Sequence, residues 1–71
     1  MLREWLKIIR EKNGISQQQV ARKLHISRQY YQQIESGDRQ QKMDITLIVK
    51  LSEVFDIPIS TIIENEKRYR Q

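Results

Sequence analysis

The sequence predicts a small all-α domain of five short helices. Apolar residues recur three or four positions apart along the chain, which is the spacing of helices that each bury one face. Favourable N-capping residues stand before three of these stretches, at Ser16, Ser27 and Asp44. The 71 residues include only two glycines and one proline, and all three lie near the expected helix ends. A chain of this length has room for one domain with one small core.

The first helix is expected from about Leu2 to Lys12, and Gly14 ends it. Its apolar residues follow helical spacing, so they form one inward stripe. The expected stripe consists of Leu2, Leu6 and Ile9, widened by Trp5 and Ile8.

The second helix is expected from about Gln17 to Leu24. Ser16 precedes it as the N-cap, and Gln19 stands at the spacing of a capping box, in which each side chain bonds the other residue's backbone. Its inward face consists of Val20, Ala21 and Leu24.

The third helix is expected from Arg28 to about Ser36, with Ser27 as its N-cap and Gly37 after its end. Tyr31 and Ile34, three positions apart, form its apolar side. Only His25 and Ile26 separate it from the second helix, so the turn is tight and the two helices must cross steeply. This is the helix-turn-helix arrangement.

The other face of the third helix carries four long side chains with planar hydrogen-bonding ends: Arg28, Gln29, Gln32 and Gln33. Arginine bonds both acceptors of guanine, and glutamine pairs with the donor and the acceptor of adenine. A solvated polar helix face has a similar composition. The two N-caps, the short turn and the charge distribution favour the major groove of double-stranded DNA instead. These four residues are therefore the expected base-reading set.

The fourth helix is expected from Ile45 to Phe55, capped by Asp44, and the fifth begins near Pro58. The stripe of the fourth helix is Ile45, Ile48, Leu51 and Phe55, widened by Leu47 and Val54. The apolar side of the fifth is Ile59, Ile62 and Ile63. Ile62 is expected in the core.

Charge is distributed unevenly along the chain. Residues 1–42 carry nine basic and four acidic side chains, residues 43–66 one basic and five acidic, and residues 67–71 three basic. A basic block that contains the polar helix predicts a surface for a polyanion. We expect a DNA-binding domain over residues 1–66 and a basic C-terminal tail over residues 67–71.

Composition excludes several classes of site. The chain has no cysteine and one histidine, so thiolate metal sites and disulfides are excluded, and general acid–base or nucleophilic catalysis has little material. There is no apolar signal region at the start and no run long enough to span a membrane. We expect a cytoplasmic protein that is not an enzyme and holds no cofactor or metal.

The segment from Ser16 to Gly37 resembles the Cro and lambda-repressor type of helix-turn-helix, also called Xre-like. The residues that carry the resemblance are Ser16-Gln17, Ala21, Leu24, Ile26, Ser27 and Ile34-Glu35-Ser36-Gly37. The likeness continues without a gap over roughly residues 2 to 63. It implies a five-helix lambda-repressor-like domain with the helix-turn-helix as helices 2 and 3.

The resemblance also implies contacts to the DNA backbone. Arg10 is expected to pair with Glu35 and to lie close to a phosphate, and Gln17 at the start of the second helix is the family's phosphate contact. The loop after the third helix adds Arg39 and Lys42 as charged phosphate contacts. Tyr30 has three open roles: it donates to a phosphate, touches a thymine methyl group, or covers the helix pair.

Several residues depart from the family's pattern. His25 stands where the family usually has glycine in a left-handed conformation, which histidine adopts at some cost. Tyr31 replaces an aliphatic residue, and we expect a largely buried ring with its hydroxyl near the surface. Trp5 and Ile8 occupy positions that are often polar, and the hypothesis is that Tyr69 or a second subunit covers them.

The sequence therefore predicts a sequence-specific DNA-binding transcriptional regulator, most simply a repressor. As the resemblance implies, it would bind a two-fold operator as a homodimer through the region of the fifth helix, where Ile57 and Ile59 are candidates for contact with the partner. One alternative is an antitoxin that represses its own operon and neutralises a toxin partner. The other is a protein-interaction module that kept the fold and lost DNA binding, against which Arg39 and Lys42 argue.

Overall fold

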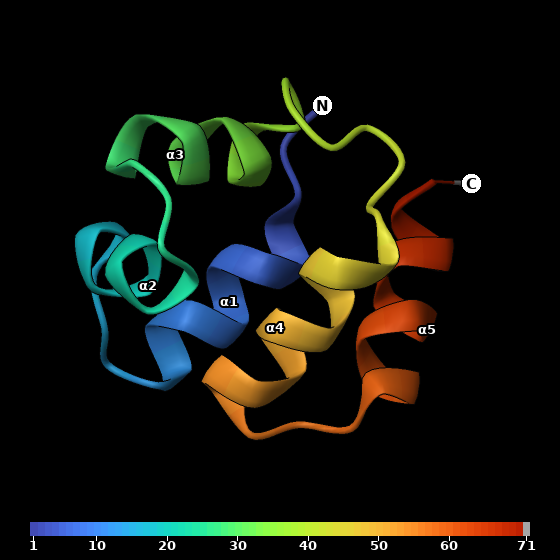
Figure 1. Cartoon of the computed structure of the whole chain (residues 1–71). Helices are drawn as coiled ribbons and strands as arrows, with labels where there is room; N and C mark the ends of the chain where they lie inside the picture. The colour runs from blue at the N-terminus through green and yellow to red at the C-terminus, as the bar shows by residue number, and fades with distance from the viewer. Residues whose placement is uncertain (71) are drawn as a thin grey trace.

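The computed structural model describes residues 1–70, and over this range the chain forms five α-helices and no strand. They are α1 (Glu4–Lys12), α2 (Gln17–Leu24), α3 (Arg28–Ser36), α4 (Ile45–Phe55) and α5 (Ile59–Tyr69). In Figure 1, α1 and α4 cross the middle of the molecule, α2 and α3 lie together on one side, and α5 covers the other. The predicted all-α fold is confirmed, with the helix-turn-helix as α2 and α3.

The core draws on all five helices. Its apolar residues are Leu6, Val20, Ala21, Leu24, Tyr31, Ile34, Leu47, Leu51, Phe55 and Ile62. Most of them come from the predicted inward stripes, so the helical periodicity identified the buried faces correctly. Tyr31 and Ile34 are both fully buried, which anchors the underside of α3. Ile62 is buried as predicted.

Leu2 and Ile45, each at one end of a predicted inward stripe, are exposed, so the prediction was wrong for these two residues. α1 begins at Glu4, and Leu2 is 45% exposed because the segment before the helix turns the side chain of Arg3 inward in its place. Ile45 is 76% exposed. Ile45 is the first residue of α4. Because side chains lean toward the N-terminus of their helix, the Ile45 side chain extends beyond the end of α4 and no other part of α4 covers it.

The three predicted N-caps are confirmed. Ser16 and Gln19 form both halves of a capping box before α2. The Ser27 hydroxyl accepts from the backbone N–H of Tyr30 at 3.0 Å, and the Asp44 carboxylate accepts from that of Leu47 at 2.8 Å. Each cap satisfies a backbone donor that a helix start would otherwise leave unpaired.

Left-handed residues end three of the helices. His25 closes α2 with φ +58°, as the family resemblance implied, Gly37 closes α3 with φ +86°, and Asp56 closes α4 with φ +53°. Gln40, in the loop between α3 and α4, also has positive φ, at +57°. No local signal in the sequence predicts this last conformation.

α5 runs unbroken from Ile59 to Tyr69, so the division expected after residue 66 lies inside a helix. Gln71, the last residue of the expected tail, lies outside the described residues. Among residues 1–70, no helix is both long enough and apolar enough to cross a membrane.

Candidate nucleic-acid interface

The two faces of α3 differ in burial. Its underside holds Tyr31 and Ile34, both at 0% exposure, while Arg28, Gln29 and Gln32 are exposed on the outer face. Gln33 is half-buried at the edge between the two faces. The helix thus presents amide and guanidinium groups outward from an apolar base.

The turn before α3 is short because His25 reverses the chain in one residue. The N–H of His25 donates to Arg22 O and the N–H of Ile26 donates to Ala21 O, at 3.1 and 3.0 Å. The chain then enters α3 at once through the Ser27 cap. This geometry holds α3 across α2, as a helix-turn-helix requires.

Glu35, on the last turn of α3, links three helices. Glu35 is 3% exposed. Its carboxylate accepts hydrogen bonds from Arg10 Nε at 2.6 Å, Gln17 Nε2 at 3.1 Å and the Tyr31 hydroxyl at 2.6 Å. The predicted pair between Arg10 and Glu35 is therefore present. It ties α1 and the start of α2 to the back of α3.

Opposing effects act on the pKa of Glu35. Burial alone raises the pKa of a carboxyl group, but hydrogen bonds from Arg10, Tyr31 and Gln17 outweigh it and hold the pKa of Glu35 below its ordinary value. The hydrogen bond to Glu35 raises the pKa of Arg10. Burial and the same carboxylate raise the pKa of Tyr31. Glu35 is therefore ionised and Tyr31 is neutral at physiological pH.

The position of the Tyr31 hydroxyl corrects the prediction that it would lie near the surface. Tyr31 is 0% exposed, and its hydroxyl points at Glu35, one helical turn along α3. A buried carboxylate needs donors, and residues four apart on a helix are neighbours. The aliphatic residue expected from the resemblance would not supply such a donor.

Gln17 and Arg10 both direct side-chain nitrogens at Glu35 rather than away from the protein. Arg10 also donates through Nη1 to the carbonyl oxygen of Ile15, at 3.1 Å. Both residues are only half-buried, so part of each remains accessible beside the start of α2. Their predicted role at phosphates stays a prediction.

The loop from Gly37 to Met43 packs onto the edge of α3. Arg39 donates through Nε to the side-chain oxygen of Gln33 at 3.0 Å, and its guanidinium lies 5.5 Å from the centroid of the Tyr30 ring. Gln40 donates to the Tyr30 hydroxyl at 3.2 Å. The structure thus brings together Tyr30, Gln33 and Arg39, from both predicted site classes.

Tyr30 is half-buried, and its ring supports the Arg39 side chain. Its hydroxyl oxygen already accepts from Gln40, which leaves the hydroxyl hydrogen for another acceptor. Of the three roles left open, covering the helix pair is visible in the packing of Tyr30 against the core. The two roles toward DNA stay open.

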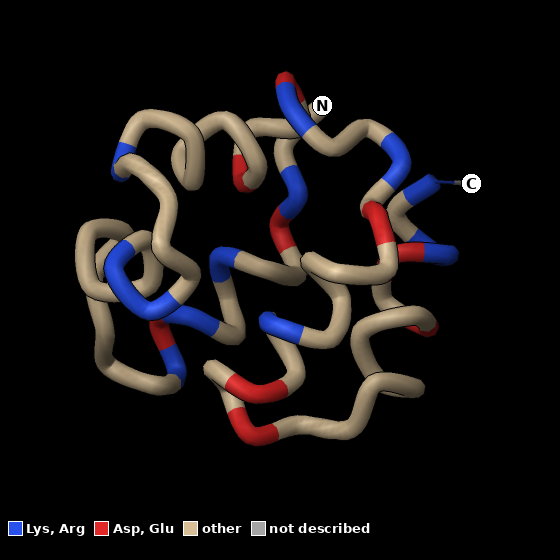
Figure 2. The backbone as a smooth tube through the Cα atoms, viewed as in Figure 1, with Lys and Arg blue, Asp and Glu red and all other residues tan. Residues whose placement is uncertain are grey.

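Lys42 is exposed in the same loop. Figure 2 shows basic residues at the end of α2, at the start of α3 and in this loop, and acidic residues at the end of α4 and in its connection to α5 as well as at other places on the molecule. Glu53 and Asp56 belong to that acidic region. The charge asymmetry along the chain is therefore also an asymmetry in space.

Arg3 and Glu66 were missed by the reasoning from sequence, although both are buried and bonded to each other. One signal was available: Glu66 stands four residues after Ile62, on the apolar side of α5. A carboxylate in that position needs a buried partner, and the basic residues of the chain are the candidates for it.

The comparisons with known proteins agree with this geometry. The family model described as helix-turn-helix matches residues 6–62. A protein of Bacillus subtilis (strain 168) named "Uncharacterized HTH-type transcriptional regulator YqaF" is 45% identical over 40 residues. These residues are 56% of this chain and 53% of the relative, so the match spans about half of that protein's length. No solved structure gives a significant match.

The family match covers α2 and α3 together with most of the helices that support them. It therefore rests on the same elements that produce the exposed polar face. The relative carries the name of a transcriptional regulator. The chain belongs to the helix-turn-helix family of the Cro and lambda-repressor type, a family of DNA-binding domains.

Proposed function

We propose that the chain is a sequence-specific repressor that binds a two-fold DNA operator as a homodimer. The observation that carries the proposal is the outer face of α3, where Arg28, Gln29 and Gln32 are exposed above a fully buried underside. A helix held this rigidly keeps its base-reading groups in one pose. Repression follows when the bound dimer occupies a promoter.

In this proposal α3 enters the major groove. Arg28 reads guanine through both acceptors of that base, and Gln29 and Gln32 read adenine through its donor and acceptor. Gln33 stands beside them at the edge of α3 and shares its side-chain oxygen with Arg39. Its amide nitrogen remains a donor for a base, so Gln33 connects base reading with the phosphate-binding loop.

The phosphate contacts flank α3 on two sides. On one side are Arg10, in the last turn of α1, and Gln17, the first residue of α2. On the other are Tyr30, in the first turn of α3, and Arg39 and Lys42, in the loop that follows α3. Contacts to phosphates fix the register of a protein on the duplex and make its affinity fall as salt rises. This division assigns specificity to the outer face of α3 and orientation to its surroundings.

For the dimer contact, α5 offers two exposed isoleucines one turn apart, Ile59 at 42% and Ile63 at 39% exposure. Ile57, just before the helix, is half-buried. A two-fold dimer through this surface would present two copies of α3 to half-sites about one helical turn apart. Replacing both exposed isoleucines, as Ile59→Glu/Ile63→Glu, is expected to give a folded monomer in sedimentation equilibrium.

The test of the proposal is selection of bound duplexes from a random pool. We expect an enriched inverted repeat whose half-site centres are about 10 base pairs apart. Placed in a promoter that drives a reporter, this site is expected to lower expression when the protein is present. Enrichment of a single half-site would refute the dimer, and absence of any enriched sequence would refute specific reading.

Gln32→Ala and Gln33→Ala then separate the two kinds of contact. Gln32→Ala is expected to weaken binding to the selected site by ~1–3 kcal/mol and to leave binding to random duplex nearly intact. Gln33→Ala is expected to cost as much on the selected site, and it should also weaken random-duplex binding because Arg39 loses its anchor. Equal losses on both duplexes for Gln32→Ala would show that the residue does not read bases.

A further inference from the structure

Arg3 is fully buried just before α1, and nothing in the base-reading or phosphate-binding sets explains it. Its Nε and Nη2 donate to the two carboxylate oxygens of Glu66, at 2.9 and 2.8 Å. The same guanidinium donates through Nη1 to Ile34 O and through Nη2 to Gln40 O, each at 2.6 Å. One cation thus joins α5, the end of α3 and the loop that follows it.

The contact with α3 answers a general need of helices. The last carbonyl groups of a helix have no partner within it, and a cation is favourable beside them. The Arg3 side chain supplies a donor to Ile34 O, and its backbone N–H donates to Glu35 O at 2.6 Å. The N-terminal segment therefore caps the C-terminal end of α3, as Figure 1 shows by the position of the N-terminus beside that end.

The contact with the loop holds a strained residue. Gln40 has φ +57°, a left-handed conformation that is strained for a residue with a side chain. Its carbonyl is held by Arg3, and its side chain bonds Tyr30 and Asp44. Arg39 directly precedes Gln40 and Lys42 lies two residues after it. Any shift of the Gln40 carbonyl therefore moves both proposed phosphate contacts.

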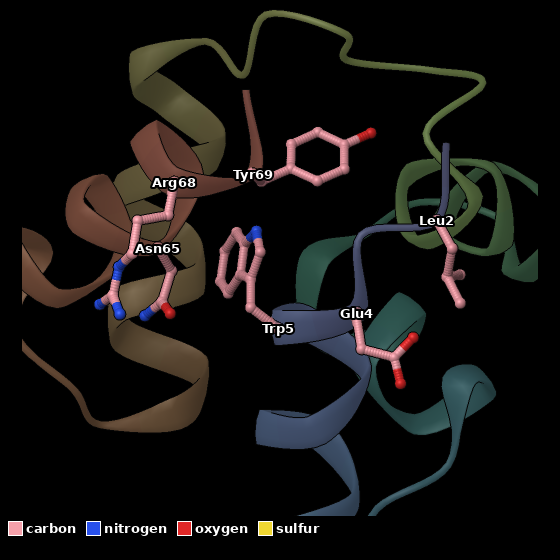
Figure 3. A pocket seen from close by; sticks show the side chains of 6 residues that line it. All are labelled: Leu2, Glu4, Trp5, Asn65, Arg68 and Tyr69. Carbon is pink, nitrogen blue, oxygen red and sulfur yellow. The ribbon is translucent and has the colours of Figure 1, made fainter. Parts of the chain in front are cut away.

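Aromatic residues support the pair from the other side. The Trp5 indole N–H donates to Glu66 Oε1 at 3.2 Å, and the Arg3 guanidinium lies 4.9 Å from the centroid of the Tyr69 ring. The Tyr69 hydroxyl donates to Met1 O at 2.6 Å. Figure 3 shows Trp5 directed from α1 toward α5, beside Asn65 and below Tyr69. These contacts restrict Arg3 and Glu66 to one arrangement.

We propose that Arg3 is a positioning residue for DNA binding: its pair with Glu66 holds the Gln40 carbonyl and so sets the pose of Arg39 and Lys42 toward the phosphates. Arg3 itself is buried and does not touch DNA. The inference rests on the proposed function and extends it, because it assigns part of the interface to a pair of residues 63 positions apart in the sequence.

The test compares Arg3→Lys and Glu66→Gln with the unmodified protein over a salt series, using the selected duplex and a random duplex. Arg3→Lys keeps the positive charge and loses the planar guanidinium that bonds both oxygens of Glu66. Glu66→Gln keeps the guanidinium of Arg3 and removes the negative charge opposite it. We expect each variant to bind both duplexes about tenfold more weakly at low salt. The slope of log affinity against log salt should fall by about 1–2, because each lost phosphate contact removes about 0.9 from it.

Two comparisons separate positioning from a loss of stability. In the background Arg39→Ala/Lys42→Ala, Arg3→Lys is expected to add no further loss of affinity, because the loop no longer carries the contacts that Arg3 positions. Ser52→Ala is the matched control, since it breaks a hydrogen bond to Ile57 O at the far end of α4. It should lower stability and leave the salt slope unchanged.

Two outcomes would contradict the proposed role of Arg3. A folded Arg3→Lys or Glu66→Gln protein with the unmodified salt slope would overturn the inference, and so would a full additional loss in the Arg39→Ala/Lys42→Ala background. Should Arg3→Lys fail to fold, Glu66→Gln carries the same comparison. Failure of the unmodified protein to bind any duplex would refute the proposed function instead.

Discussion

Replacing Tyr31 by phenylalanine tests the buried carboxylate that supports α3. The substitution keeps the ring, so it opens no large cavity, and it removes a hydroxyl that donates to Glu35 at 2.6 Å. A hydrogen bond to a charged group contributes about 1.5–3 kcal/mol. We expect Tyr31→Phe to lower the free energy of unfolding by about 2 kcal/mol at pH 7, or the melting temperature by roughly 8–16 °C for a domain of this size.

Urea unfolding followed by far-UV circular dichroism measures the effect, and Tyr30→Phe is the matched control. The Tyr30 hydroxyl accepts from a neutral amide and is only partly buried, so its removal should cost under about 1 kcal/mol. A loss for Tyr31→Phe no larger than that for Tyr30→Phe would refute the idea that Glu35 depends on this donor.

The difference in unfolding free energy between the unmodified protein and Tyr31→Phe should depend on pH. The pKa of Glu35 in the folded state lies below its ordinary value of 4.5, because the bonds from Arg10, Tyr31 and Gln17 outweigh burial. Its contribution to stability is therefore complete above about pH 4.5 and is lost as the pH falls through the lower folded value. Tyr31→Phe removes one of those donors, so the difference in unfolding free energy between the two proteins should become smaller below pH 4.5. A constant gap down to complete acid unfolding would contradict this account.

Three further predictions concern backbone strain and burial. Gly37→Ala should cost well over 1 kcal/mol in urea unfolding, because a Cβ there would clash with the backbone oxygen of Met1. Gly14→Ala, also at positive φ but with open space around it, should cost about 1 kcal/mol. Equal losses would mean that the close packing at Gly37 does not matter. His25→Gly should raise the melting temperature by several degrees, because it relieves a left-handed residue, and a lower value would contradict that. Ile45→Ser should change the unfolding free energy by less than about 0.5 kcal/mol, whereas Leu51→Ala should cost about 2–5 kcal/mol; comparable losses would show that Ile45 is buried.

Local signals explain why much of the fold was predictable. The bounds of α2 and α3 agree with the sequence because Ser16, Ser27 and Gly37 mark their ends through short-range hydrogen bonds and backbone preference. The two-residue spacing between the helices predicted the tight turn, and the family resemblance implied the left-handed conformation of His25. The outer face of α3 was predictable for the same reason, because burying Tyr31 and Ile34 forces the glutamines to the opposite side.

Long-range polar contacts were less accessible. Arg3 and Glu66 are 63 residues apart, and neither helical periodicity nor capping rules connect them. Arg10 and Glu35 were paired only because the family resemblance supplied the pair. The inward hydroxyl of Tyr31 was missed because its partner, Glu35, was assigned to Arg10 alone. In each case the missing information was the position of a partner in space rather than a local preference.

The buried carboxylates suggest what the polar interior of this domain achieves. Glu35 fixes the last turn of α3 against α1 and the start of α2, while Glu66, through Arg3, fixes the end of α3 and its loop against α5. Buried ion pairs add little net stability compared with apolar packing, because removing both charges from water offsets their attraction. Their directional bonds do select one arrangement among many that an apolar contact would permit. A domain that must present a single polar helix face at one angle gains more from such selection than from a larger apolar core.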